Sequence, residues 1–214
     1  MQRTLMGYWR SSCSWRVRIA LNWKGLPYET SPVHLVADGG WQHRPEHRAV
    51  NPMRQVPVLV DGGMALSQSV AILEYLEERH PEPPLLPADP QARARVRQLT
   101  EVINSGIQPL QNLSVMQRLG AEFALTPEQT RAWSRGCIAR GFEALEALVE
   151  THGGTCCVGD AVSFADLCLV PQLYNARRFE VDLSRTPRLC AIERHLTALP
   201  AFAQAHPDAQ PDAA

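Results

Sequence analysis

Apolar positions in the N-terminal part of the chain alternate between short strand-like runs and a helical spacing. Residues 5–9 are apolar and aromatic, as expected of a buried strand. Residues 14–24 carry apolar side chains at helical spacing, and Gly25 supplies the stop at the end of this helix. Residues 28–33 predict a second strand, which returns parallel to the first through the helix. The pattern therefore begins with a β-α-β unit.

A second group of elements follows a loop at Asp38-Gly39-Gly40 and a break at Asn51-Pro52. Residues 56–60 are extended and β-branched, residues 61–63 (Asp-Gly-Gly) are a hairpin signal, and residues 65–66 predict another short strand. A helix is expected over residues 69–79. These elements add a β-β-α unit to the first.

The pattern changes after a cluster of prolines between residues 81 and 90, which cannot continue a helix and predicts a linker. Beyond the cluster the spacing is helical. One helix is expected over residues 96–110, with an interruption at Gly106 and Pro109. Two more are expected after the capping boxes at 126–129 and 163–166, the first of them stopping at Gly153. The tail from His206 is expected to fray.

These elements predict a fold that joins an α/β part to an all-α part. The expected domains are a β-α-β/β-β-α domain at residues 1–82, a proline-rich linker at 83–90 and an all-helical domain at 91–214. Of the 214 residues, 45% are hydrophobic and 20% charged, as in globular proteins. The net charge of −1 argues against a nucleic-acid partner, which would need a basic surface.

Cysteine usage and hydropathy bound the cellular setting. The six cysteines, at positions 13, 137, 156, 157, 168 and 190, show no CxxC or metal-ligand spacing. No apolar stretch reaches the length of a membrane span, and no charged-then-apolar signal segment opens the sequence. The sequence therefore predicts a reduced, cytoplasmic protein without a structural metal or a membrane partner.

Candidate chemistry is concentrated in the run Arg10-Ser11-Ser12-Cys13-Ser14-Trp15-Arg16-Val17-Arg18, at the start of the first predicted helix. A helix N-terminus carries roughly half a positive elementary charge, so it stabilises an anion such as a thiolate or a carboxylate. The three arginines add to the positive field. The serines are equally well explained as helix caps, and the run alone leaves both interpretations open.

Several segments carry a resemblance that extends over nearly the whole chain. Residues 11–21 are similar to the signature of the zeta-class glutathione transferases, whose members are maleylacetoacetate isomerases. Residues 51–57 (Asn-Pro-Met-Arg-Gln-Val-Pro) and 68–72 (Gln-Ser-Val-Ala-Ile) match the segments that hold glutathione in that family, and residues 107–114 and 165–172 are also zeta-like. The resemblance implies a thioredoxin-like first domain, an all-helical second domain, glutathione as the cofactor, and a homodimer.

The resemblance also implies roles for individual residues. Ser11, Ser12 and Cys13 are the catalytic candidates, and which of them ionises the thiol stays open. Cys13 is expected to shape the site, because glutathione itself brings the reacting sulfur. Arg10 and Arg178 are expected to bind substrate carboxylates, although the neighbouring Arg177 leaves the register open. The candidates for binding glutathione are Ser11, Ser12, Cys13, Ser14, Trp15, Arg16, Gln42, Val56, Gln68, Ser69, Gln108, Asn112, Leu113 and Ser114.

Three of these candidates are assigned to particular parts of glutathione. Val56, before an expected cis-proline at 57, would offer its backbone to the cysteinyl part. Ser69, at the start of a helix, would bind the γ-glutamyl carboxylate. Gln42 would contact the glycyl end.

The implied reaction converts maleylacetoacetate to fumarylacetoacetate by thiolate addition, rotation and elimination. Isomerisation of maleylpyruvate and glutathione transfer to α-halo acids would use the same groups. A non-enzymatic glutathione-transferase-like scaffold is a further alternative. The intact Ser11-Ser12-Cys13 and Gln68-Ser69 segments favour an enzyme, because a scaffold needs neither.

Overall fold

The computed structural model describes residues 3–213, which form two compact units. Unit 1 contains the described residues up to Pro84 together with those from Ala198 onward, and unit 2 is Leu85–Thr197. The expected domains, 1–82, 83–90 and 91–214, follow the order of the chain. Packing instead assigns the last residues of the chain to unit 1.

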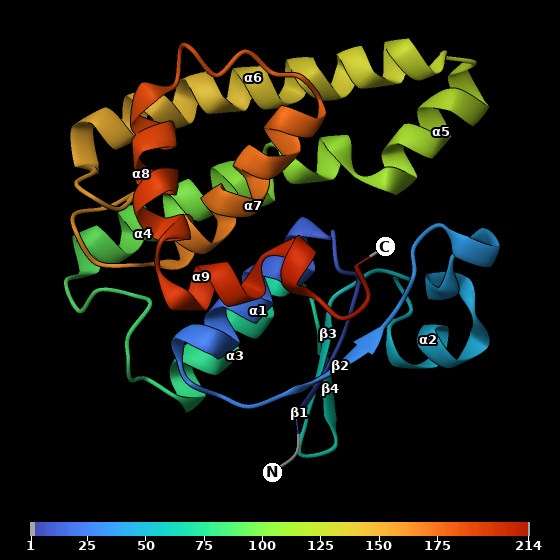
Figure 1. Ribbon diagram of the computed structural model, residues 1–214, viewed down its shortest axis with the longest axis horizontal. Coiled ribbons are helices and arrows are strands. Elements are labelled where there is room, and N and C mark those ends of the chain that lie inside the picture. The colour runs from blue at the N-terminus through green and yellow to red at the C-terminus, as the bar shows by residue number, and fades with distance from the viewer. Residues whose placement is uncertain (1–2, 214) are drawn as a thin grey trace. The chain divides into compact units, whose positions relative to one another are not determined.

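Unit 1 is built on a mixed four-stranded sheet (Figure 1). Its strands are β1 (Arg3–Gly7), β2 (Glu29–Pro32), β3 (Val58–Asp61) and β4 (Met64–Ser67), in the order β2-β1-β3-β4. Strand β2 is parallel to β1, whereas β3 pairs antiparallel with both β1 and β4. The expected β-α-β and β-β-α units are therefore confirmed, with the strand limits shifted by one or two residues.

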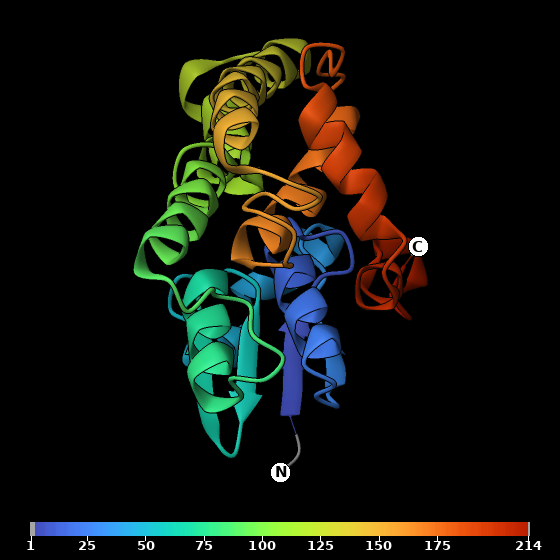
Figure 2. The same ribbon diagram turned by 90° about the vertical axis from the view of Figure 1, so that its left-hand side faces the viewer.

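Two helices cover one face of this sheet. Helices α1 (Ser12–Trp23) and α3 (Ser69–Arg79) lie side by side in front of the strands in Figure 2, and the short α2 (Pro45–Val50) lies on the other side of the sheet in Figure 1. Two single 3₁₀ turns, Ala37–Gly39 and Trp41–His43, precede α2. The limits of α3 agree with the sequence prediction. The apolar residues whose spacing predicted this helix are the ones buried against the sheet and α1.

Lys24, the only lysine of the chain, joins the ends of α1 and α3. Its buried ammonium lies 2.7 Å from Oε2 of Glu77, and it donates to the carbonyl oxygens of His80 (2.7 Å) and Pro83 (3.0 Å). All three ammonium hydrogens therefore have acceptors, as a buried charge requires.

The C-terminal residues are part of unit 1, so the expectation that the tail frays from His206 is wrong. Helix α9 (Pro200–Ala205) packs against α1, and a 3₁₀ turn follows at Pro207–Ala209. Further along, a carboxylate oxygen of Asp212 accepts from the N–H of Trp9. Composition predicted a frayed tail because the contacts that hold it join residues about two hundred positions apart, which no local pattern can reveal.

Unit 2 is helical (Figure 1). Helix α7 (Phe164–Arg178) packs against α4 (Pro90–Asn104), α6 (Pro127–His152) and α8 (Pro187–Thr197). Both expected capping boxes are present, at Thr126–Gln129 and at Ser163–Asp166. The expected interruption after α4 is confirmed, since the chain leaves the helix after Asn104 and resumes with a 3₁₀ turn, η3. The elements are α4 (Pro90–Asn104), η3 (Gln108–Gln111), α5 (Leu113–Phe123), α6 (Pro127–His152), α7 (Phe164–Arg178) and α8 (Pro187–Thr197).

The second capping box also fixes the loop before it. The carboxylate of Asp166 accepts from the N–H and hydroxyl of Ser163 and from the N–H of Cys157. Burial raises the pKa of Asp166, and these three donors partly oppose that effect.

Within residues 3–213, the helices are too short or too polar for any of them to cross a membrane.

Candidate functional site

The first candidate position is the start of α1. Ser11 is the N-cap, because its hydroxyl oxygen accepts from the N–H of Ser14 (3.2 Å) and its carbonyl accepts from the N–H of Trp15 (2.9 Å). The N–H groups of Ser12 and Cys13 have no acceptor in the part of the chain that the structure describes. These two donors and the positive end of the helix dipole can bind and stabilise an anion.

The candidates at positions 11–16 divide into two groups. Ser11, Ser12 and Cys13 lie on the first turn, where Ser11 and Cys13 are half-buried and Ser12 is 7% exposed. Ser14, Trp15 and Arg16 are buried inside unit 1. Ser14 packs beneath the end of β1, since a Cβ added at Gly7 would lie 3.1 Å from its hydroxyl oxygen. The buried side chains of the second group therefore pack inside unit 1 and hold the first turn of α1 in place.

The second candidate position is the start of α3. The N–H groups of Ser69 and Val70 have no acceptor in the described residues, whereas Ile72 donates to the carbonyl of Gln68. The Ser69 hydroxyl accepts from Nη1 of the buried Arg16 (3.2 Å), which leaves its own proton free to be donated. Arg16 therefore links the two helix starts and adds a positive charge beneath Ser69.

Gln68 holds an unusual backbone conformation at this second position. Its φ of 72° lies in a region that residues other than glycine rarely adopt. Such conformations persist where the surrounding structure requires them and are concentrated at functional sites. The conformation supports the prediction that the Gln68-Ser69 junction has a binding role.

The segment before β3 also presents backbone groups. The peptide bond between Val56 and Pro57 is cis, as expected. Neither the N–H nor the C=O of Val56 has a partner among residues 3–213. The preceding carbonyl, that of Gln55, is held by Asn51 (2.9 Å) and by a ring nitrogen of His47 (2.9 Å).

Gln42 has a fixed orientation in the second 3₁₀ turn. Its amide nitrogen donates to the carbonyl of Leu35 (3.2 Å), and its buried amide oxygen has no partner among the described residues. Gly40 makes this arrangement possible, because its φ is 95° and a Cβ there would lie 2.4 Å from the Gln42 amide nitrogen. An unpaired buried amide oxygen is a group that a ligand can satisfy.

Arg10 directly precedes the N-cap of α1. Its guanidinium lies over the indole ring of Trp9, 5.1 Å from the ring centroid. The described residues include no carboxylate within ion-pair distance of it. Arg10 can therefore bind a carboxylate from outside the protein.

In unit 2 the predicted polar residues pair with one another. Asn112 is the N-cap of α5, and its Oδ1 accepts from the N–H (3.1 Å) and the hydroxyl (3.0 Å) of Ser114. Gln108, on η3, and Leu113, on the first turn of α5, are half-buried. The cap explains Asn112 and Ser114 without a ligand, so their binding role stays a prediction.

A buried amide pair that the sequence did not reveal lies beside these residues. Gln111 donates through Nε2 to Oε1 of Gln172 (3.0 Å), which joins η3 to α7. Oε1 of Gln111 and Nε2 of Gln172 are buried and have no partner in the described chain. Gln172 lay within a zeta-like segment of the sequence, and no residue pattern indicated that the two amides would meet.

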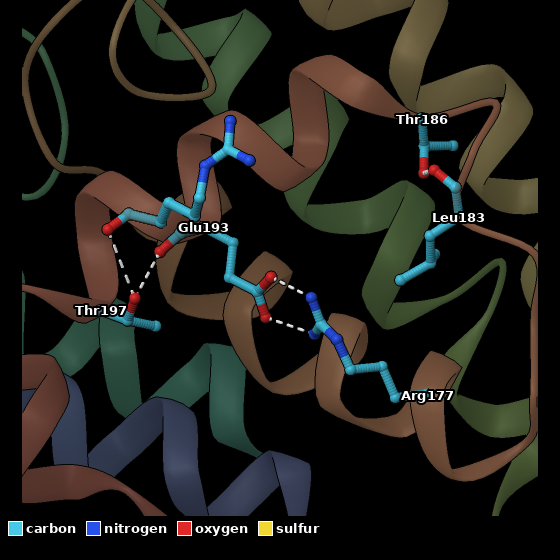
Figure 3. Close-up of polar contacts among 6 residues, drawn as sticks. Arg177, Leu183, Thr186, Glu193 and Thr197 are labelled. Atoms are coloured by element: carbon cyan, nitrogen blue, oxygen red, sulfur yellow. Dashed lines mark hydrogen bonds and ion pairs between the residues drawn. The ribbon is translucent and has the colours of Figure 1, made fainter.

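The structure separates the two neighbouring arginines at the end of α7. Arg177 donates to both carboxylate oxygens of Glu193 on α8, at 2.6 and 2.5 Å, and this pair is drawn in Figure 3. Hydrogen bonding to Glu193 raises the pKa of Arg177. Arg178 instead donates to Oδ1 of Asn175 (3.3 Å) and lies over the ring of Phe179. Arg177 is therefore committed to a helix–helix contact.

The carboxylates near Arg178 in the sequence have partners elsewhere. Glu180 pairs with Arg135 (3.0 Å), and Asp182 accepts from the N–H of Ser184. In Figure 3, Thr186 and Thr197 also bond to main-chain oxygens of their own segments, so the α8 region is held by local contacts as well as by Arg177. Because Glu193 already binds Arg177, the role of Arg178 at a substrate carboxylate stays a prediction.

Two buried cysteines of unit 2, Cys156 and Cys157, are poor sources of a thiolate. Burial raises the pKa of Cys156 to about 12 and the pKa of Cys157 well above its usual value. A raised thiol pKa leaves the group protonated at neutral pH. Cys13, by contrast, lies in the first turn of α1.

A thioredoxin-like unit whose helices α1 and α3 begin with available N–H donors, followed by a helical unit, is typical of the glutathione-transferase class of proteins. Comparison with known proteins agrees. Residues 10–79 match the family model of the glutathione S-transferase N-terminal domain, and residues 117–200 match that of the C-terminal domain.

Individual relatives show to which class of glutathione S-transferases the chain is most similar among those compared. A probable maleylacetoacetate isomerase 2 of Drosophila melanogaster is 52% identical over 99% of this chain and 91% of its own. A maleylacetoacetate isomerase of Anaeromyxobacter dehalogenans, solved with bound dicarboxyethyl glutathione and citrate, is 48% identical with a TM-score of 0.88, covering 100% of this chain and 98% of its own. A bacterial maleylpyruvate isomerase, described as a zeta-class enzyme, is 42% identical with a TM-score of 0.95, covering 99% and 100%. The chain belongs to the glutathione S-transferase family, in the zeta class that includes the maleylacetoacetate isomerases.

Proposed function

We propose that this protein is a glutathione-dependent cis–trans isomerase that converts maleylacetoacetate to fumarylacetoacetate. The observation that carries the proposal is the pair of helix starts in unit 1, linked through Arg16 and Ser69, each with N–H groups that lack an acceptor among the described residues. The identity of about half the residues with proteins named maleylacetoacetate isomerase supports the choice of substrate.

The residues of unit 1 fit the parts of glutathione. The start of α3 suits the γ-glutamyl carboxylate, because a helix N-terminus and a hydroxyl both donate there. The unpaired N–H and C=O of Val56 suit the cysteinyl backbone, in the manner of strand addition. The amide of Gln42 suits the glycyl end. The start of α1 then suits the thiolate.

When bound, glutathione supplies a thiolate whose addition to the cis double bond leaves a single bond that can rotate, and whose elimination restores the double bond as trans. The N–H groups of Ser12 and Cys13, with a hydroxyl of Ser11 or Ser12, keep that sulfur ionised. The same donors stabilise the negative charge that develops on the acid. Arg10 and Arg178 bind its carboxylates, because a guanidinium holds a carboxylate bidentately.

The ligand of one relative agrees with this chemistry. Dicarboxyethyl glutathione, bound to the Anaeromyxobacter enzyme, carries two carboxylates on a two-carbon group attached to the sulfur. Such a product results when a glutathione thiolate adds to a cis or trans enedioate. For this chain, we take it as support for thiolate addition to a diacid.

Two alternatives remain within the same chemistry. The similarity to a maleylpyruvate isomerase favours that shorter acid as a second candidate. Transfer of glutathione to α-halo acids needs only the thiolate site. A scaffold without activity is disfavoured because it would leave the donors at both helix starts without a purpose. Turnover of maleylacetoacetate and maleylpyruvate, measured side by side with glutathione, distinguishes the substrates.

The mechanism requires that glutathione be needed but not consumed. Isomerisation should therefore stop without glutathione, while the concentration of free thiol stays constant during turnover. Absorbance of the product and a thiol assay on the same sample measure both quantities. A stoichiometric loss of thiol would instead indicate a transferase, and full activity without glutathione would exclude the scheme.

We also propose, from the resemblance, that the protein is a homodimer, that it works in the cytoplasm, and that Gln108, Asn112, Leu113 and Ser114 contact glutathione. Sedimentation at micromolar concentration tests the dimer, which a monomer would refute. The contacts of unit 2 are tested by glutathione affinity in single alanine variants.

A further inference from the structure

Arg10 and Ser11 directly follow Trp9, and the main chain of Trp9 is held from two directions. Its N–H donates to Oδ2 of Asp212 (3.1 Å), near the end of the described chain. Its C=O accepts from Nη2 of Arg18 on α1 (2.8 Å). The peptide groups on both sides of Trp9 are therefore fixed immediately before the first anion-binding turn.

Asp212 is inserted into unit 1 rather than lying free on its surface. Its second oxygen, Oδ1, is buried and has no partner among residues 3–213. The carboxylate also acts electrostatically on Arg18. Burial lowers the pKa of Arg18 to about 10, so its guanidinium stays charged at neutral pH and faces a carboxylate.

The segment that carries Asp212 is anchored along α1. Nε of Arg18 donates to the carbonyl of Ala205 (3.1 Å), and Nδ2 of Asn22 donates to that of Ala201 (3.2 Å). The ring of His206 meets that of Trp15 edge to face, with centroids 5.2 Å apart. In Figure 1 this part of the chain runs beside α1. It therefore reaches Trp9 with little freedom.

We propose that Asp212 is a positioning residue for the reaction. By holding the Trp9 N–H it fixes the indole on which Arg10 stacks and the start of α1 that follows, and so sets where Arg10 and the N–H groups of Ser12 and Cys13 meet an anionic acid. This inference rests on the proposed function. None of the sequence motifs pointed to Asp212.

The experiment compares Asp212→Ala, which removes the acceptor, with Asp212→Asn, which keeps an oxygen that can accept from Trp9. Asp208→Ala is the matched control, because Asp208 lies exposed in the same segment. For each protein, kcat and KM for maleylacetoacetate are measured at saturating glutathione, with the melting temperature. We expect Asp212→Ala to lower kcat/KM by about ten- to a hundredfold, since a displacement of about 1 Å costs about a hundredfold. Asp212→Asn should stay within about threefold of wild type, and Asp208→Ala should be unchanged.

A double-mutant cycle with Arg10→Ala tests the route through Arg10. If Asp212 acts by placing Arg10, Asp212→Ala should have a much smaller effect on KM in the Arg10→Ala protein than in wild type. An equal effect in both backgrounds, or a folded Asp212→Ala protein with unchanged kcat/KM, overturns the proposal. Inactive wild-type protein would instead count against the proposed function.

A second measurement keeps the test valid if Asp212→Ala does not fold. In the unmodified protein the amide hydrogen of Trp9 should exchange slowly with solvent, because it is bonded to Asp212. In a chain that ends at Gln210 it should exchange faster, while amides of β3 keep their rates. Fast exchange of the Trp9 amide in the unmodified protein overturns the proposal.

Discussion

The two units hold their candidate residues in different ways. In unit 1 the candidates are mainly backbone donors at the starts of α1 and α3, and their direction is set by where each helix begins. In unit 2 they are side chains whose availability depends on neighbours: Arg177 is bound by Glu193, and Asn112 is bound to Ser114. In unit 1 the chemistry follows from element boundaries, whereas in unit 2 it follows from which partner each side chain has taken.

The largest effect on turnover is expected at the start of α1. If the backbone donors of unit 1 carry the chemistry, changes there should lower turnover more than changes in unit 2. Ser12→Ala should lower turnover by about one to three orders of magnitude, the range for losing a donor that stabilises developing charge. Ser11→Ala should also lower stability by about 0.5–2 kcal/mol, because Ser11 caps the helix. Steady-state kinetics and thermal melting on both variants separate the two roles.

Cys13→Ala is the control for this prediction and should keep most of the activity. If the cysteine variant is inactive while both serine variants turn over normally, the thiol is the essential group. Loss of activity only in Ser11→Ala, beyond what its stability explains, would assign the ionising role to Ser11 and not to Ser12.

The next largest effect is expected on KM for the diacid, at the two neighbouring arginines of α7 in unit 2. Arg178→Ala should raise KM for the diacid by about ten- to a hundredfold, since a charge-assisted bond is worth about 1.5–3 kcal/mol and is present in ground and transition states alike. Glutathione affinity should change little. Arg178→Lys should recover only part of the loss, because lysine lacks the planar fork.

Arg177→Ala is the matched control, one residue away. It removes the bidentate contact to Glu193, so the melting temperature should fall by a few degrees while KM stays near wild type. The Arg177 side chain is half-exposed, which limits its contribution to stability. A raised KM in Arg177→Ala with an unchanged KM in Arg178→Ala would reverse the assignment.

The sequence predicted what depends on local pattern. The limits of α3, both capping boxes and the break after α4 follow from spacing and caps along one stretch of chain. It did not predict α5, in which no residue is buried. Nor could it place the C-terminal tail or show that Arg177 pairs with Glu193. Those outcomes depend on Asp212 meeting Trp9 and on Glu193 meeting Arg177, contacts between distant elements.

The smallest effect tests whether unit 2 depends on paired side chains. Gln111→Leu and Gln172→Leu should each lower the free energy of unfolding by about 1–3 kcal/mol, because each leaves the other buried amide unpaired. The double variant should recover much of the loss, since removing both partners together leaves no unpaired amide. Gln117→Leu, on the exposed side of α5, is the control and should change stability little. Denaturant unfolding of the four variants measures the coupling. If the single losses simply add, the amides act independently, and the pair does not hold η3 to α7.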